Sequence, residues 1–158
     1  MRRSDREVKN RDEILEIIKK CDVCRLSLCQ DNVPYIVPMN FGYEYESECL
    51  TLYFHGASEG KKHDIMKQNP IVCFEMDCSH RLVEAAEPQK FTMEYESVIG
   101  MGRIVICNEK QDKLRALNSI MGKYAHGRNF DFPDQILNAV HVFKIEATDF
   151  TAKRLMMK

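Results

Sequence analysis

The chain has 158 residues, of which 44% are hydrophobic and 30% charged, and its formal net charge is -1. This length fits one domain with its own core, so residues 1–158 are expected to form a single domain. A net charge near zero gives no electrostatic reason to expect nucleic acid or an anionic membrane as a partner. No segment approaches the roughly 18–20 apolar residues of a membrane span, and no signal peptide is recognisable. We therefore expect a cytoplasmic protein.

The first half of the chain predicts one helix and then a series of short strands. Apolar residues at helical spacing predict a helix over 10–20, which Asn10 caps. The apolar period then changes to two, which predicts, in order, a strand at 24–28, a turn at 30–32, a strand at 33–41, a polar turn at 44–48 and a strand at 50–55. Pro34 and Pro38 lie in the second strand. Because proline cannot donate to a ladder, that strand is expected at a sheet edge.

The second half of the chain predicts helices between buried strands. In order, the pattern predicts a helix at 58–68 capped by Ser58, a strand at 72–76, an exposed loop at 77–89, a strand pair or one bent strand at 91–106, helices at 110–124 and 133–138, and a strand at 140–147. Gly100 and Gly102 mark a bulge or a close approach. About six hairpin-spaced strands with marginal helices favour an antiparallel barrel, in the mainly β or α+β class.

The seven cysteines are an odd number for a disulfide framework. Without a signal peptide they are expected to be reduced, and most lie in apolar stretches typical of small core residues. The single CxxC at 21–24 has no second ligand pair at zinc spacing, so we predict no metal site. No role is predicted for the histidines that lie in no motif, which are His63, His80, His126 and His141.

The segment at 54–62 carries the clearest chemical signal. A strand ends, Gly56 allows a tight turn, and a helix is predicted from Ser58 with Lys61 and Lys62 in its opening turns. A helix N-terminus offers free N–H groups and a partial positive charge, so a hydroxyl and two ammonium groups beside it predict a phosphate site. The alternative is a capped surface helix with solvated lysines. The spacing fits neither a Walker loop nor a dinucleotide fingerprint.

Two nearby features could contact the rest of a ligand. His55 ends a strand, where it could donate to a ligand or carry a proton, or it could be a barrel-rim histidine bonded to backbone. The run Val37, Pro38, Met39 and Asn40 leaves backbone groups unpaired, and Asn40 adds a donor and an acceptor for the edge of a flat heterocycle. The alternative for this run is an edge strand that proline protects from aggregation.

These segments together resemble the pyridoxamine 5'-phosphate oxidase-like, FMN-binding split barrels, and among them the 5-nitroimidazole resistance proteins. The matching segments run in order along the chain as MRRSDRE, CRLSL, PYIVPMNFGY, LYFHGASEGKKHDIM, NPIVCFEMD, ESVIGMGR and NFDFP. The resemblance implies a six-stranded antiparallel split β-barrel with flanking helices. It also implies a homodimer with a flavin at each end of the subunit interface.

The resemblance assigns flavin contacts residue by residue. They are Val37, Pro38, Met39 and Asn40 at the isoalloxazine edge, Phe54, His55 and Gly56 along the ring and ribityl chain, Ser58, Lys61 and Lys62 at the phosphate, and Ser97 and Gly100 from another strand. The family often has arginine where Lys61 stands. Lysine keeps the charge but lacks the bidentate fork, so a lower phosphate affinity is expected.

The implied function is that of an FMN-dependent oxidoreductase that reduces a nitro group on a small heterocycle, with His55 as the catalytic residue. The flavin would supply the redox chemistry. FAD is also open, because its extra nucleotide could extend into solvent. The second hypothesis is a non-catalytic module that holds flavin, or haem with His55 or His80 as axial ligand. The lysine pair after His55 favours a phosphate over haem.

Overall fold

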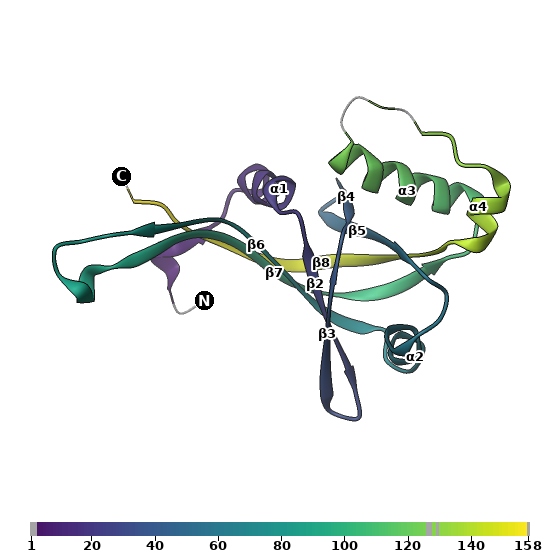
Figure 1. The fold of residues 1–158 in the computed structure, drawn as a ribbon, viewed down its shortest axis with the longest axis horizontal. Helices are drawn as coiled ribbons and strands as arrows, with labels where there is room; N and C mark the ends of the chain where they lie inside the picture. The colour runs from purple at the N-terminus through teal and green to yellow at the C-terminus, as the bar shows by residue number, and fades with distance from the viewer. Residues whose placement is uncertain (1–2, 126–127, 129, 158) are drawn as a thin grey trace.

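The computed structural model describes residues 3–125, 128 and 130–157 (Figure 1). The strands of this part of the chain are β1 (Glu7–Val8), β2 (Cys24–Gln30), β3 (Val33–Met39), β4 (Gly42–Glu46), β5 (Cys49–Gly56), β6 (Ile71–Val83), β7 (Thr92–Cys107) and β8 (His141–Leu155). The helices are α1 (Arg11–Lys20), α2 (Lys61–Gln68), α3 (Lys110–Tyr124) and α4 (Asp134–Ala139), with 3-10 turns η1 (Ser4–Arg6) and η2 (Pro88–Lys90). None of the described helices is long and apolar enough to cross a membrane.

The strands form one antiparallel sheet. Its order is β3-β2-β6-β7-β8-β5-β4, so β3 and β4 are the end strands, and β1 pairs with β8. In Figure 1 the long strands β6, β7 and β8 cross the molecule, and the β6–β7 hairpin projects beyond the other elements. In that view α1 and α3 lie on one side of the long strands, and α2 lies on the other side near the β2–β3 hairpin.

Several predicted elements are confirmed. The Asn10 side chain caps α1 by accepting the N–H groups of Asp12 and Glu13, at 2.8 and 3.3 Å. Asp31 and Asn32 turn the β2–β3 hairpin with positive φ values of 51° and 62°, as a tight hairpin turn requires. Strand β3 is an end strand, as its two prolines predict, and α3 has the predicted bounds.

The polar turn predicted at 44–48 is wrong over most of its length. Strand β4 continues through this segment and pairs with β5, and only Ser47 and Glu48 turn the chain, with φ values of 50° and 63°. Tyr43 and Tyr45 pack partly buried against the core from this strand. The glutamates between and after these tyrosines make the segment polar, so its composition predicts a turn and not a strand.

The exposed loop predicted at 77–89 is also wrong in its first half, because β6 and β7 pair far beyond the body of the sheet. We call this extension the β6–β7 arm (residues 78–96). A register shift between Cys78 and Arg81 interrupts the pairing, and Arg81 then donates two hydrogen bonds to Glu94 at 2.7 and 2.6 Å. Charged residues pair across these two strands where apolar and polar residues would otherwise alternate. The sequence pattern therefore did not predict the strands.

Helix α2 starts later than the sequence predicts. It begins at Lys61, not at Ser58, and no side chain caps it. Its N-cap is Gly60, with φ 115° and ψ 167°, a backbone conformation that is essentially restricted to glycine. Ser58 therefore lies in the loop before the helix. The predicted final strand is likewise longer, since β8 extends well past residue 147.

Buried apolar side chains form two clusters on the two sides of β5. The larger cluster contains Phe54, Phe74 and Phe143, and the rings of Phe54 and Phe143 stack at 5.2 Å. The smaller one contains Tyr53 and Leu117 and lies under α3 and α4. Because side chains alternate along a strand, consecutive β5 residues face different clusters.

One face of the sheet leaves large apolar side chains exposed. We call it the outer apolar face, and its members Ile36, Ile71, Ile99 and Met101 are 62%, 46%, 49% and 56% exposed. Ladder pairing joins β3 to β7 through β2 and β6, so these side chains lie on one continuous surface. Contiguous apolar surface of this kind is typical of a contact site.

Candidate functional site

The segment between β5 and α2 forms the lysine turn (residues 56–62). Ser58 is exposed within it, and Gly60 turns the chain into the helix. The first hydrogen bonds of α2 reach the Gly60 carbonyl from the third and fourth N–H groups of the helix, at 2.9 and 3.4 Å. The N–H groups of Lys61 and Lys62 precede that ladder and have no side-chain cap. Such groups, with the positive end of the helix dipole, favour an anion.

The two lysine side chains of this turn have different neighbours. A Cβ atom on Gly56 would lie 2.8 Å from Lys62 Nζ, so the missing side chain makes room for this ammonium group. Lys61 Nζ lies 4.6 Å from the centre of the Tyr35 ring, within cation–π range. Sequence reasoning missed Tyr35, because only the folded chain brings β3 to α2.

Strand β3 presents its two faces differently. Tyr35, Val37 and Met39 are half-buried and pack against the larger core cluster, while Pro38 and Asn40 are exposed. Asn40 Nδ2 donates to the Asp22 carbonyl at 3.3 Å, so part of its predicted bonding capacity is used within the chain. Tyr35 and Met39 are about 13 Å apart along an extended strand. The free edge of β3 therefore extends from Lys61 into the segment predicted to meet the isoalloxazine ring.

The end of β5 separates His55 from the lysines. The Phe54 side chain is fully buried, so only its backbone can line a ligand. Alternation puts Gly56 on the side of Phe54 and His55 on the side of Tyr53, toward α3 and α4. Lys62 lies over Gly56. The exposed His55 ring thus projects from the opposite face of the strand to Lys62.

Ser97 and Gly100 are not brought to the lysine turn within one chain. Cys107 lies at the level of the turn in the β7–β8 ladder, and Ser97 is ten residues away, roughly 30 Å along the strand. Gly100 is buried, and a Cβ there would collide with the ring of Phe74 and with Phe150. Gly100 thus marks the close approach that the sequence predicts, within the core. Ser97 could approach a lysine turn only from a second copy of the chain.

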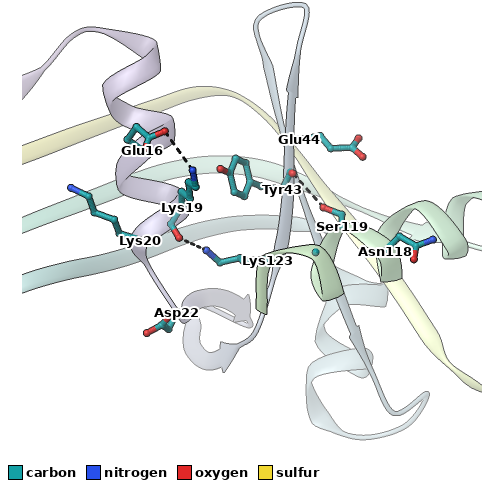
Figure 2. A pocket seen from close by; sticks show the side chains of 10 residues that line it. Glu16, Lys19, Lys20, Asp22, Tyr43, Glu44, Asn118, Ser119 and Lys123 are labelled. Atoms are coloured by element: carbon teal, nitrogen blue, oxygen red, sulfur yellow. Dashed lines mark hydrogen bonds and ion pairs between the residues drawn. The ribbon is translucent and has the colours of Figure 1, made fainter. Parts of the chain in front are cut away.

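A hollow of about 690 Å³ lies elsewhere, between α1, α3 and β4 (Figure 2). Lys123 Nζ donates to the carbonyls of Ile18 and Lys19 at 3.1 and 2.8 Å, and Ser119 Oγ donates to the Tyr43 carbonyl at 3.3 Å. Burial lowers the pKa of Lys123. None of the predicted flavin contacts is among the residues that line this hollow. Its basic group holds the two helices together.

Comparison with known proteins places the chain in a family. The family model described as pyridoxamine 5'-phosphate oxidase matches residues 10–154, nearly the whole chain. No curated protein matches the chain.

Three solved structures share the fold. A protein from Bacteroides thetaiotaomicron, provisionally assigned as a 5-nitroimidazole antibiotic resistance protein, is 30% identical over 94% of this chain and 86% of its own, with a TM-score of 0.82. The flavocytochrome Anf3 from Azotobacter vinelandii is 18% identical over 99% and 72%, with a TM-score of 0.81. A FAD and haem binding protein from Mycobacterium smegmatis is 14% identical over 96% and 74%, with a TM-score of 0.81. The predicted split-barrel fold is confirmed, with eight strands in place of six.

Proposed function

The chain belongs to the pyridoxamine 5'-phosphate oxidase family, and we propose that it is an FMN-dependent oxidoreductase that reduces a small heterocyclic acceptor such as a nitroimidazole. The observation that carries this proposal is the lysine turn, where an uncapped helix N-terminus carries two adjacent lysines. The 30% identity to the Bacteroides thetaiotaomicron protein supports the acceptor class.

The residues of the turn fit the phosphate of FMN. The N–H groups of Lys61 and Lys62, their ammonium groups and the Ser58 hydroxyl are donors, and a phosphate dianion accepts from donors only. The backbone edge of β3 would meet the flavin ring from Val37 to Asn40. A bound flavin supplies the redox chemistry, and the chain supplies binding and orientation. FAD fits as well, because Ser58 lies exposed at the rim of the turn.

His55 acts on the acceptor in this proposal and contributes little to holding the phosphate. Its ring is exposed and lies on the face of β5 opposite to Lys62. A neutral imidazole can donate to a nitro oxygen, and a charged one can also give up a proton. Negative charge develops on those oxygens during reduction, so a donor there lowers the barrier.

A homodimer completes the proposed site. The outer apolar face exposes four large side chains, and a symmetric partner can cover the same surface on both chains. Ser97 lies on that side of the sheet, because it alternates with the buried residues of β7. A second copy is therefore the route by which Ser97 reaches a flavin.

A second candidate function is a binding module that holds flavin or haem without efficient turnover. It is favoured by the shared fold of the flavocytochrome and of the FAD and haem binding protein. His55 is the better candidate for an axial ligand, since the His80 ring already contacts Asp77 at 2.9 Å.

The absorbance spectrum of the purified protein tests the cofactor, because flavin and haem absorb differently. We expect a flavin spectrum, and then reduction of a nitroimidazole in a steady-state assay with chemically reduced flavin as the electron source. A colourless protein that shows no fluorescence change when FMN is added contradicts the proposal. A flavin-bound protein without turnover leaves the binding module as the correct function.

A further inference from the structure

Two free thiols from distant parts of the sequence meet at the base of the β6–β7 arm. Cys21 is the C-cap of α1, and Cys78 lies in β6. The Cys21 N–H donates to the Ile17 carbonyl at 3.2 Å, and the Cys78 thiol lies 4.0 Å from the same oxygen. Burial raises the pKa of Cys21, and the charge and the hydrogen bond of the Cys78 side chain raise it further. The folded chain therefore gives Cys21 a thiol partner that its CxxC spacing does not predict.

The two thiols differ in their access to solvent. Cys21 is fully buried and belongs to the larger core cluster. Cys78 is half-buried and lines a hollow of about 410 Å³, together with Lys20, Arg25 and His80 among other residues. A small oxidant in this hollow can therefore reach the Cys78 sulfur, while Cys21 lies shielded within the core.

Two cations and a hydroxyl lie close to the Cys78 sulfur. The Cys78 thiol is 3.9 Å from Glu96 Oε2, and Lys20 Nζ donates to the same oxygen at 2.8 Å. Arg154 donates to the other oxygen of this carboxylate at 2.7 Å, so two positive charges offset one negative charge. Ser79 Oγ lies 3.6 Å from the Cys78 sulfur and can donate to it. Cations and hydrogen-bond donors favour the thiolate, which is the reactive form of cysteine.

The backbone around Cys78 is irregular. The β6–β7 ladder shifts its register between Cys78 and Arg81, and Ser79 has a positive φ of 60°. A shift of this kind leaves residues of the bulged strand unpaired and bends the strand locally. Because regular pairing stops at Cys78, its backbone can adjust to the geometry of a disulfide more easily than a residue within a continuous ladder.

We propose that Cys78 and Cys21 form a peroxide-reactive thiol pair that closes reversibly to a disulfide. In the first step the Cys78 thiolate attacks one oxygen of hydrogen peroxide, which gives a sulfenic acid and hydroxide. The hydroxide takes up the proton that the thiol released and becomes water. In the second step the Cys21 sulfur attacks the Cys78 sulfur, and the sulfenic hydroxyl leaves with the Cys21 proton as a second water. The two thiols thus lose two electrons, and peroxide is reduced to two water molecules.

Peptide mapping of the whole protein tests the pair directly. The protein is treated with hydrogen peroxide, its remaining thiols are blocked with N-ethylmaleimide, and the digest is analysed by mass spectrometry without reductant. We expect a linked peptide that joins Cys21 to Cys78 and that disappears when dithiothreitol is added. Location matters because the chain has seven free thiols. A link between Cys21 and Cys24, oxidation only at other cysteines, or no disulfide overturns the proposal.

Single variants separate the roles of the two thiols. Cys21→Ala should abolish the disulfide and leave a Cys78 sulfenic acid, which dimedone traps, and Cys78→Ser should abolish both products. Cys49→Ser is the matched control, because Cys49 is also half-buried but its thiol contacts the Leu50 carbonyl at 4.0 Å, and the disulfide should form unchanged. Equal dimedone labelling of Cys78 in the wild type and in Cys21→Ala overturns the proposal. Should a variant fail to fold, the linked peptide of the wild type decides the question.

Discussion

Lys61 and Lys62 are adjacent in the sequence, yet their side chains contact different elements of the structure. Lys61 lies over the Tyr35 ring of the end strand, and Lys62 lies over the bare backbone of Gly56. The two ammonium groups thus lie against two different strands, β3 and β5. An anion between them would be bound through both.

Replacing both lysines with alanine should separate the phosphate from the rest of the flavin. A charge-assisted hydrogen bond is worth about 1.5–3 kcal/mol, and exposure puts these two near the lower value. We expect the FMN affinity to fall roughly 100-fold and the riboflavin affinity by less than about 3-fold. Fluorescence titration measures both, with Lys90→Ala as control. Equal losses for the two ligands would place the phosphate elsewhere.

Tyr35 should affect FMN binding only through its contact with Lys61. Tyr35→Phe keeps the ring and should leave FMN affinity within about 2-fold. Tyr35→Leu removes a cation–π contact worth about 0.5–1 kcal/mol and should weaken FMN binding roughly 2–5-fold. In a Lys61→Ala background the leucine variant should cause no further loss, as a double-mutant cycle can show. An undiminished loss in that background would mean that Tyr35 acts by packing alone.

His55→Ala should change turnover and leave flavin binding nearly intact. The ring is exposed and projects away from Lys62, so thermal stability and FMN affinity should hardly move. Reductive turnover should fall by roughly 10²–10⁴-fold, as for a lost acid–base or electrostatic group. A variant that loses flavin but turns over normally at saturating FMN would assign His55 a structural role.

These residues also show what the sequence can predict of a site. The lysines and Gly56 follow from local pattern, since strand, turn and helix start are contiguous in the chain. Tyr35 carries no local signal, because its contact depends on a lysine from another element. The Ser58 cap failed for a local reason, since the backbone of Gly60 delays the helix.

At the scale of elements, apolar periodicity predicted α1, α3 and the β2–β3 hairpin, where one face is buried. It failed at β4, where glutamates alternate with the packed tyrosines, and along the β6–β7 arm, where charged residues pair across the strands. Glu96 is the clearest case, since it is fully buried within the chain. It accepts hydrogen bonds from Lys20 and Ser79 at 2.8 Å and from Arg154 at 2.7 Å. Pattern reading cannot anticipate a buried carboxylate whose partners come from α1 and β8.

Glu96→Gln should destabilise the protein near neutral pH by about 1–3 kcal/mol, the cost of leaving charged partners unsatisfied. Burial alone would raise the pKa of Glu96, but the three donors hold it below its ordinary value of 4.5. A lowered carboxyl pKa stabilises the fold above the ordinary value, and this contribution is lost as the pH falls through the folded-state pKa. The stability gap between wild type and variant should therefore narrow below about pH 4.5. Urea unfolding at several pH values measures it, and a gap independent of pH would contradict this account.

At the scale of the molecule, a single chain does not bring together all the residues of the proposed flavin site. The lysine turn lies at one level of the long strands, Ser97 lies roughly 30 Å away, and the outer apolar face remains in solvent. The sequence points to an edge strand through its prolines but cannot show which surface a partner would cover.

Ile36→Lys combined with Met101→Lys should break the proposed homodimer. Both side chains are more than half exposed in the single chain, so the monomer should tolerate the change, while two buried charges would oppose association. Sedimentation at micromolar concentration should give a dimer for the wild type and a monomer for the variant. Ile136→Lys, on α4, is a control of similar exposure. A wild type that sediments as a monomer with flavin bound contradicts the proposal.

The pairing of Gly56 with His141 in the β5–β8 ladder has a consequence for how the lysine turn is anchored. Lys62 lies against Gly56 on one side of this backbone rung, and the neighbouring rings of His63 and His141 adjoin it on the other. A phosphate held at the turn would contact the end of this ladder, so flavin binding should slow amide hydrogen exchange in β5 and β8 near Gly56.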